Sequence, residues 1–223
     1  MDKRSDKTIQ SRQESKQESE LKRGNPTRTM SSQQLMAPDF SALIKDANPV
    51  WNLQKCRIRP CRETDAEALV MEANNSKIAR CMRNVFPFPY TLESARAFIT
   101  SPSAAESPLS VFGICRPTDD RLIGCIGLTF KEDIYYRTME IGYWIGEDHW
   151  NQGIGTEAVS IFSDWLFEKF EHILRLEAHV FEGNEASGRV LEKAGFVLEG
   201  RRRKAIEKRG VVLDLLIYCK LKC

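Results

Sequence analysis

A glycine-containing turn at residues 150–157, with the sequence Trp-Asn-Gln-Gly-Ile-Gly-Thr-Glu, is suited to binding an anionic ligand. Gly153 and Gly155 let the backbone approach a ligand closely, and the surrounding amides lie at the positive end of the helix that follows. Such a helix end suits a pyrophosphate. The turn lacks the Lys-Ser/Thr pair of a P-loop and the third glycine of a dinucleotide-binding fingerprint, so nucleotide hydrolysis and hydride transfer are disfavoured. Taken alone, the pattern fits a tight turn better than a ligand site.

Three further polar residues, Glu140, Asn184 and Ser187, are candidates for chemical roles. Glu140 lies in a strand-like segment, where a carboxylate acts either as a base or as a solvated or salt-bridged side chain. Asn184 and Ser187 open a predicted helix at residues 185–193, and Asn184 fits the common role of an N-cap.

The cysteines and histidines do not predict a metal site. The chain has seven cysteines, an odd number, and no Cys-x-x-Cys pair, which disfavours both a disulfide framework and a zinc site. The histidines at positions 149, 172 and 179 lack metal-ligand spacing. We therefore expect no metal, reduced thiols and a cytoplasmic location.

Hydrophobic periodicity predicts the elements that must position these residues. Alternation and apolar runs predict strands at residues 56–59, 109–115, 122–130, 139–146, 174–181, 196–200 and 211–221. Helices are predicted after N-caps at Thr64 and Thr91, after the glycine turn, and at residues 185–193, where Gly195 ends the helix. The strand at residues 139–146 presents one face with Met139, Ile141, Tyr143 and Ile145 and another with Glu140, Gly142 and Trp144. This order of elements predicts an α/β or α+β fold, a mixed sheet with helices on its faces.

Composition limits the class of protein. The 223 residues include 33 Lys and Arg against 31 Asp and Glu, a net charge of +2, which argues against a dedicated nucleic-acid-binding protein. No apolar run approaches the ~20 residues of a membrane-spanning helix, so we expect no membrane partner. The chain begins with a stretch rich in Ser, Gln, Lys, Arg and Glu. We expect residues 1–48 to be a disordered extension and residues 49–223 to form one domain, as a monomer or a homodimer.

Five segments, taken together, resemble the GNAT acetyltransferases, and look most like the branch that contains the ribosomal-protein N-terminal alanine acetyltransferases. They are residues 86–98 (Phe-Pro-Phe-Pro-Tyr-Thr-Leu-Glu-Ser-Ala-Arg-Ala-Phe), 140–146 (Glu-Ile-Gly-Tyr-Trp-Ile-Gly), 150–158, 184–196 (Asn-Glu-Ala-Ser-Gly-Arg-Val-Leu-Glu-Lys-Ala-Gly-Phe) and 210–214 (Gly-Val-Val-Leu-Asp). The resemblance covers about residues 53–221. It implies a mixed, mostly antiparallel central sheet with helices on both faces. It also implies a V-shaped splay between the strands at 139–146 and 174–181, where acetyl-CoA binds.

The resemblance implies acetyl-CoA as the co-substrate and names the groups that hold it. Its pantetheine arm is expected to bind backbone groups of Tyr143, Trp144 and Ile145 and the side chain of Asn184. Its pyrophosphate is expected on the amides of Gln152, Gly153, Ile154, Gly155 and Thr156. Because the loop has no basic side chain, we expect the pyrophosphate to be bound mainly by these amides, the helix dipole and the Thr156 hydroxyl.

The resemblance also implies direct acetyl transfer to an amine, without a cysteine nucleophile. Glu140 is then the candidate general base, acting through water, and we expect a partly buried cleft to raise its pKa. Ser187 is a candidate to protonate the CoA sulfur, although a free serine hydroxyl is a weak acid. A backbone amide of the strand that carries Glu140 is expected to polarise the thioester carbonyl.

The sequence leaves the acceptor open between a small-molecule amine and a protein N-terminus, because acceptor choice depends on loops such as residues 84–90 and 134–138. The basic segment at residues 201–209 is either a solvated hairpin or a recruiting surface for an acidic acceptor. Asp214 either contacts the amine or fixes that hairpin. A different class of function, a catalytically silent acyl-CoA-binding or interaction module, is the alternative to an enzyme.

Overall fold

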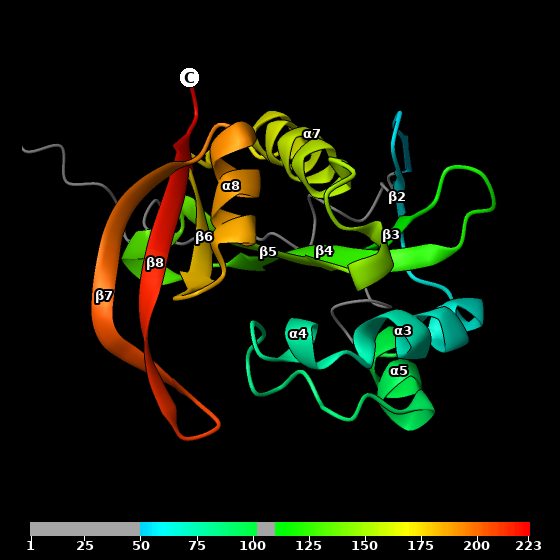
Figure 1. The fold of residues 1–223 in the computed structure, drawn as a ribbon. Helices are drawn as coiled ribbons and strands as arrows, with labels where there is room; N and C mark the ends of the chain where they lie inside the picture. Colours follow the sequence, from blue (N-terminus) through cyan, green and yellow to red (C-terminus); the bar gives the residue numbers. More distant parts are fainter. Residues whose placement is uncertain (1–49, 102–109) are drawn as a thin grey trace, which may run out of the picture. The chain divides into compact units, whose positions relative to one another are not determined.

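A computed structural model of the chain describes residues 50–101 and 110–223. These residues form an eight-stranded sheet in the order β1-β2-β3-β4-β5-β6-β8-β7, in which β5 and β6 are parallel and the other neighbours are antiparallel (Figure 1). The strands are β1 (Trp51–Asn52), β2 (Arg57–Arg59), β3 (Val111–Cys115), β4 (Leu122–Phe130), β5 (Thr138–Ile145), β6 (Arg175–Phe181), β7 (Val197–Lys208) and β8 (Val211–Leu221). The predicted mixed, mostly antiparallel sheet is therefore confirmed, whereas the predicted disordered extension, residues 1–48, lies outside the described residues.

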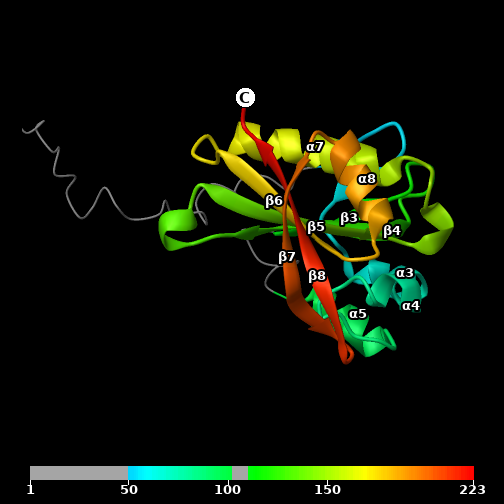
Figure 2. The same ribbon diagram turned by 60° about the vertical axis from the view of Figure 1, so that its left-hand side comes forward.

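Helices cover both faces of the sheet, as predicted. One face carries α7 (Ile154–Lys169) and α8 (Glu185–Lys193), and the opposite face carries α3 (Ala66–Ala73), α4 (Ser76–Ala79) and α5 (Leu92–Ile99) (Figures 1 and 2). Short 3-10 turns lie at Glu63–Asp65, Asp133–Tyr135 and Glu147–His149. The predicted caps of α5 and α8 are present, because the side chains of Thr91 and Asn184 accept from backbone amides in the first turn of each helix.

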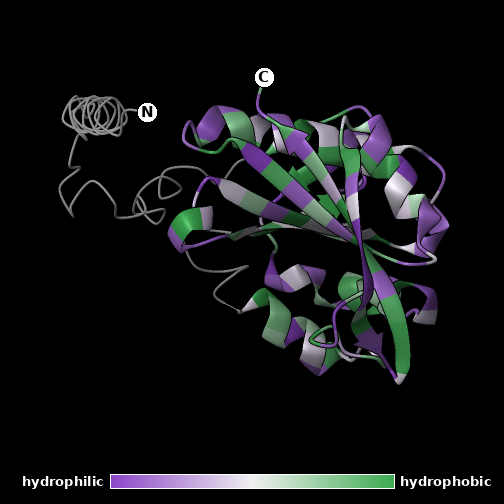
Figure 3. Cartoon of the chain, turned by 90° about the vertical axis from the view of Figure 1, so that its left-hand side faces the viewer, coloured by the Kyte–Doolittle hydropathy of each residue, from purple (hydrophilic) through white to green (hydrophobic). Residues whose placement is uncertain are grey.

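The core has two apolar layers, one on each side of the sheet. Along β5, Met139, Ile141 and Ile145 are buried beneath α7, whereas Trp144 is buried on the side of α3 and α5. The central strands β3 and β4 are apolar along most of their length because both of their faces are covered, whereas other strands, such as β6, alternate between buried and partly exposed residues (Figure 3). The predicted division of β5 into two faces is confirmed.

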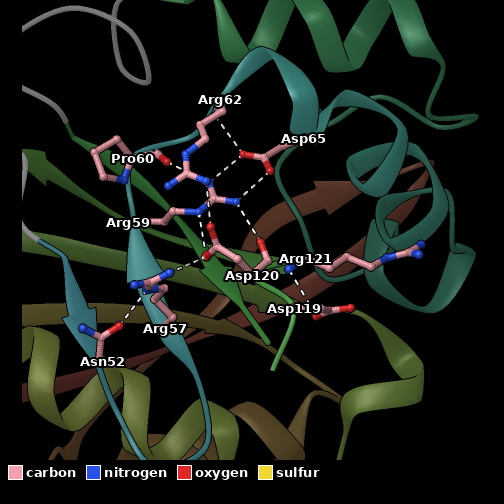
Figure 4. A network of polar contacts seen from close by, with 9 residues as sticks. All are labelled: Asn52, Arg57, Arg59, Pro60, Arg62, Asp65, Asp119, Asp120 and Arg121. Carbon is pink, nitrogen blue, oxygen red and sulfur yellow. Dashed lines mark hydrogen bonds and ion pairs between the residues drawn. The ribbon is translucent and has the colours of Figure 1, made fainter. Parts of the chain in front are cut away.

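A buried ion pair fixes α3 to the sheet (Figure 4). Arg59 of β2 and Asp65, both at most 5% exposed, form two parallel hydrogen bonds of 2.8 Å each. Arg59 also donates to Asp120 in the β3–β4 turn, and the Asp65 hydrogen bond holds its guanidinium protonated by raising its pKa. The N-cap of α3 is Asp65, so the predicted N-cap at Thr64 is wrong; Thr64 lies inside the preceding 3-10 turn. The Asp65 carboxylate also accepts from the backbone N–H of Arg62.

The β7 strand is longer than the sequence pattern predicts, whereas β8 has the predicted bounds. β7 was expected to end at Gly200, but it pairs with β8 as far as Lys208 opposite Val211, and the turn is Arg209–Gly210. Charges along residues 201–208 are compatible with a strand here because most of these side chains are exposed on a two-stranded ribbon. The ribbon extends past the edge of the sheet toward the segment between α4 and α5 (Figure 1).

Candidate active site

The parallel strands β5 and β6 separate part-way along their length. They pair at four positions, from Thr138 opposite Arg175 to Ile141 opposite Ala178. Both strands continue beyond this point, β5 to Ile145 and β6 to Phe181, without pairing to each other. A Cβ placed at Gly142, the next residue of β5, meets no atom within 4 Å, so the space there is open. The separation gives β5 a free backbone edge at Tyr143, Trp144 and Ile145, which is the predicted V.

The glycine turn after β5 forms an uncapped helix end. Gly153 is the N-cap of α7 in the left-handed conformation, with φ of 78°, and no side chain caps this end of the helix. The amides of Ile154, Gly155 and Thr156 are therefore the first of the helix and lie at its positive end. A Cβ at Gly155 would lie 3.4 Å from Ile145 and 3.5 Å from Val190, which is ordinary van der Waals contact, so these neighbours leave room for it.

A lysine distant in the sequence lies beside this turn. Lys55 Nζ donates to the Gln152 carbonyl oxygen at 3.1 Å and lies 2.7 Å from the position of a Cβ on Gly153. Glu157 holds the segment in place, because its carboxylate accepts from the backbone N–H groups of Gln54 and Lys55 at 3.2 and 2.8 Å. The loop itself has no basic side chain, as its sequence shows, and Lys55 brings one beside it from a segment about 100 residues earlier in the chain. Nothing in the local sequence around Lys55 indicates this contact.

The start of α8 brings Asn184, Ser187 and Tyr143 together. The Asn184 side chain accepts from the Ser187 amide at 3.4 Å, and the Tyr143 hydroxyl lies 2.9 Å from Ser187 Oγ. Burial raises the pKa of Tyr143 to about 12, against the opposing effect of the Ser187 hydrogen bond. Ser187 is thus part of a hydroxyl pair rather than a lone hydroxyl.

Two tryptophans flank the end of β5. The Trp150 indole donates to the Ile145 carbonyl oxygen at 2.7 Å and so closes the turn onto the strand. The Trp144 side chain packs against Phe86, with ring centroids 5.9 Å apart, and is 9% exposed. Trp144 therefore contributes its backbone to the open edge and its side chain to the core.

Glu140 lies in a cluster of cations. Its carboxylate, on a residue 8% exposed, accepts from Lys131 Nζ at 2.6 Å and from the Arg83 guanidinium, and His179 Nδ1 lies 3.5 Å away. Burial, the largest single influence, favours the protonated form, but the Lys131 hydrogen bond and the charges of His179, Arg83 and Lys131 together leave the pKa of Glu140 below its ordinary value. The expectation of a raised pKa is wrong because these basic groups together outweigh burial, and the sequence did not indicate them because they come from three other segments.

His179 is placed by the register of the parallel strands. Glu140 pairs with Glu177, so His179 lies two residues further along the same face of β6. Burial lowers the pKa of His179 and so favours the neutral ring, although Glu140 and Glu177 act in the opposite direction. The sequence predicts that His179 lies in a strand, but it does not give the register of that strand with β5, so it does not place His179 beside Glu140.

A cavity of about 240 Å³ adjoins this cluster. It is lined by Met82, Arg83, Asn84, Phe181, Ile206, Glu207 and Lys208. It thus lies where the open end of β6, the segment after α4 and the β7–β8 ribbon meet, and Arg83 connects it to Glu140. Asp214, the other candidate for contact with an amine, accepts from the Lys204 backbone N–H at 2.7 Å and from Arg201, which fixes the ribbon instead.

One thiol contacts the site, because Cys56 Sγ donates to the Glu157 carboxylate at 3.8 Å. The seven cysteines all lie within the described residues and form no disulfide there, and burial raises the pKa of Cys56 and Cys115 to about 12. The described part of the chain has no group of three or more His, Cys, Asp or Glu side chains placed to hold a metal ion. No helix within residues 50–101 and 110–223 is long and apolar enough to cross a membrane.

The comparison with protein families decides the identity of this arrangement. The family model described as the acetyltransferase (GNAT) domain matches residues 55–197. The chain belongs to the GNAT acetyltransferases. This family match covers β2 to the start of β7, and so includes the open V, the glycine turn and Glu140. The predicted family is confirmed, and the chain is an N-acetyltransferase enzyme.

Individual relatives agree with this assignment. A Bacillus subtilis (strain 168) protein named "Probable N-acetyltransferase YjcK" is 36% identical over 161 residues, 70% of this chain and 88% of that protein. The ribosomal-protein-serine acetyltransferase of Escherichia coli (strain K12) is 30% identical over 103 residues, 46% of this chain and 56% of that protein. A solved structure titled as the ribosomal L7/L12 alpha-N-protein acetyltransferase RimL in complex with coenzyme A has a TM-score of 0.68 at 18% identity, covering 78% of this chain and 98% of that one. The relatives of this GNAT enzyme thus include ribosomal-protein acetyltransferases, as predicted.

Proposed function

We propose that this chain transfers the acetyl group of acetyl-CoA directly to a primary amine, on a small molecule or a protein N-terminus. The observation that carries the proposal is the end of β5–β6 pairing at Ile141, together with the uncapped helix end at Gly153, which follows β5 after a short connection. A free strand edge and a helix N-terminus joined by one turn offer an extended thioester arm and a pyrophosphate adjacent places to bind.

The residues present fit acetyl-CoA. The open space at Gly142 leaves room for the pantetheine arm beside the backbone of Tyr143, Trp144 and Ile145. The amides from Gln152 to Thr156 bind the pyrophosphate, with Lys55 as an additional cation next to them. Asn184 lies at the start of α8 and remains the proposed side-chain contact to the arm.

Acetyl-CoA supplies an activated acetyl thioester, and the chain supplies proton transfer and orientation. The Glu140 carboxylate accepts a proton from the acceptor ammonium, directly or through water. A backbone N–H at the free edge of β5 donates to the carbonyl oxygen of the acetyl group. Ser187 Oγ, hydrogen-bonded to the Tyr143 hydroxyl, donates a proton to the sulfur. The partner hydroxyl supports this step because it can replace the proton that Ser187 gives up.

The low pKa of Glu140 favours acceptors that need little help to lose a proton. An α-amino group with a pKa near 8 is ~10% neutral at pH 7, whereas a lysine-like amine near 10.4 is neutral less than ~0.1% of the time. A carboxylate held ionised by Lys131 and Arg83 is a weak base. We therefore propose an α-amino group, of a small molecule or a protein N-terminus, as the acceptor.

The same ion pairs are the specific observation that favours the alternative function, a catalytically silent acyl-CoA-binding module. A thiol-release assay with acetyl-CoA and a panel of α-amino and ω-amino acceptors separates the two, with a thermal melt as the binding readout. At 100-fold excess over Kd, acetyl-CoA should stabilise the fold by about 2.7 kcal/mol. A stabilised protein that releases no thiol with any amine supports the silent module, and a melt that acetyl-CoA leaves unchanged refutes both functions.

A further inference from the structure

The cavity beside Glu140 contains a buried lysine that lacks an acidic partner. Lys208, near the end of β7, is 8% exposed, and its Nζ donates to the Met82 carbonyl oxygen at 2.6 Å. Among the described residues, no carboxylate lies within 4.0 Å of this ammonium. A buried charge that is hydrogen-bonded only to a neutral carbonyl is costly unless an anion joins it.

The acid in the cavity lining does not neutralise Lys208. Glu207 is the adjacent residue of β7, and neighbouring side chains of a strand point to opposite faces. Glu207 is exposed whereas Lys208 is buried, in agreement with that alternation. Burial and the neighbouring charge of Arg209 lower the pKa of Lys208, which is the expected response of a cation that lacks a counterion.

A second cation lines the same cavity. Arg83 lies on the segment after α4, its side chain is 62% exposed, and its guanidinium pairs with Glu140. Because a guanidinium has five N–H donors, it can bind a second carboxylate as well as Glu140, or exchange one for the other. Arg83 therefore links the contents of the cavity to the proposed base.

We propose that this cavity binds a carboxylate carried by the acceptor, with Lys208 and Arg83 as its cationic partners. The proposal rests on the proposed acetyl transfer and specifies its substrate class: a primary amine with a carboxylate close to it. A free amino acid derivative and a peptide whose second residue is acidic both supply this chemistry. An acceptor carboxylate that draws Arg83 toward the cavity also withdraws a cation from Glu140, and so makes Glu140 a stronger base when substrate is present.

Matched acceptor pairs test this substrate class in both forms. The small-molecule pair is aspartic acid α-amide and asparagine α-amide, and the peptide pair is Ser-Asp-Phe-amide and Ser-Asn-Phe-amide. Each pair keeps an α-amino group and exchanges only a carboxylate for a carboxamide. The wild-type kcat/KM, measured by thiol release, should favour the carboxylate member of at least one pair about 10-fold or more, the span of a charge-assisted hydrogen bond. The pair that shows the preference identifies the source of the carboxylate.

Variants assign the preference to Lys208. Lys208→Met keeps the apolar stem and should bring the ratio within each pair toward one, while Lys208→Arg should retain most of the preference. Arg202→Met, which removes a charge from an exposed position of the same strand outside the cavity lining, is the matched control and should leave the ratio unchanged. If Lys208→Met no longer melts cooperatively, the wild-type ratio and Lys208→Arg still decide the outcome.

The possible failures are distinguishable. Thiol release at equal kcat/KM for both members of both pairs overturns this inference and leaves the proposed acetyl transfer intact. A Lys208→Met protein that keeps the full preference also overturns it. No thiol release with any of these acceptors or with the wider amine panel, despite stabilisation by acetyl-CoA, refutes the proposed function and this inference with it.

Discussion

Replacing Glu140 with glutamine tests the proposed proton transfer most directly. Glutamine keeps the size and one accepting oxygen, but it cannot take a proton from the acceptor. Lys131 and Arg83 keep the glutamine oxygen as a hydrogen-bond acceptor. Their side chains are 31% and 62% exposed, so water can solvate the charges that lose their carboxylate partner, and the fold should persist. Affinity for acetyl-CoA should change little, since the side chain of Glu140 faces away from α7 and the glycine turn.

The expected loss of rate is ~10²–10⁴, or about 2.7–5.4 kcal/mol of barrier, the usual contribution of a positioned base. Because the pKa of Glu140 is low, we expect a loss of rate near ~10² for an α-amino acceptor, which is partly neutral already. The loss should be larger for a lysine-like amine, which is almost entirely protonated at pH 7. The loss should shrink as pH rises and the solution itself supplies neutral amine. Because Glu140 is ionised throughout the neutral range, it should add no inflection of its own to the rate above about pH 5.

Stability against pH gives an independent check with a defined sign. A folded-state pKa below the unfolded value of ~4.3 means that the ion pairs of Glu140 stabilise the fold above that pH. This contribution is lost as pH falls through the folded pKa, so the stability of Glu140→Gln should depend less on pH in the acidic range.

The assay is rate against pH for the wild type and Glu140→Gln, with one α-amino and one ω-amino acceptor. Glu177→Gln is the matched control, since Glu177 lies opposite Glu140 on the neighbouring strand and is paired with Arg175. It should lose much less activity than Glu140→Gln. Near-normal kcat for Glu140→Gln at pH 7 on both acceptors removes Glu140 from the mechanism.

Three further predictions test the other parts of the site and the fold. Gly153→Asp should weaken acetyl-CoA binding in calorimetry more than Asn184→Ala, which removes a hydrogen bond worth about 1 kcal/mol; equal losses in folded proteins show that the turn is not the phosphate site. Lys55→Met should weaken binding by about 0.5–1 kcal/mol at low salt and less at high salt, and a salt-independent loss contradicts an electrostatic role. Arg59→Met should lower the free energy of unfolding by about 3–5 kcal/mol because it leaves a buried carboxylate unpaired, whereas exposed Arg62→Met should cost under about 1 kcal/mol in denaturant titration.

The elements around the site could be predicted because local signals agreed with each other. β4 has the predicted bounds, and α8 begins after the predicted N-cap Asn184 and is followed by Gly195 with φ of 90°. These features depend on a few neighbouring residues, whose periodicity and capping are visible in the sequence. The β7 strand was predicted too short because a charged segment is typical of a loop, while an exposed ribbon tolerates the same residues.

The electrostatics of the site could not be predicted in the same way. A strand pattern shows which face Glu140 occupies, but it does not show what packs on that face. Arg83, Lys131 and His179 come from three different segments, and their combined effect reverses the direction of the pKa shift that burial alone produces. Lys55 beside Gln152 and Lys208 beside Met82 are likewise contacts between residues far apart in the chain.

The register of β5 joins the fold of this enzyme to its chemistry. Glu140 pairs with Thr129 of β4 and with Glu177 of β6, so its side chain and that of Ile141 must point to opposite faces. A shift of β5 by one residue would bury the Glu140 carboxylate in the apolar layer beneath α7 and turn Ile141 toward the basic side chains on the other face. Both changes would destabilise the fold, so the register is fixed. The burial that fixes this strand therefore also fixes the carboxylate beside Arg83, at the point where β5 and β6 begin to separate.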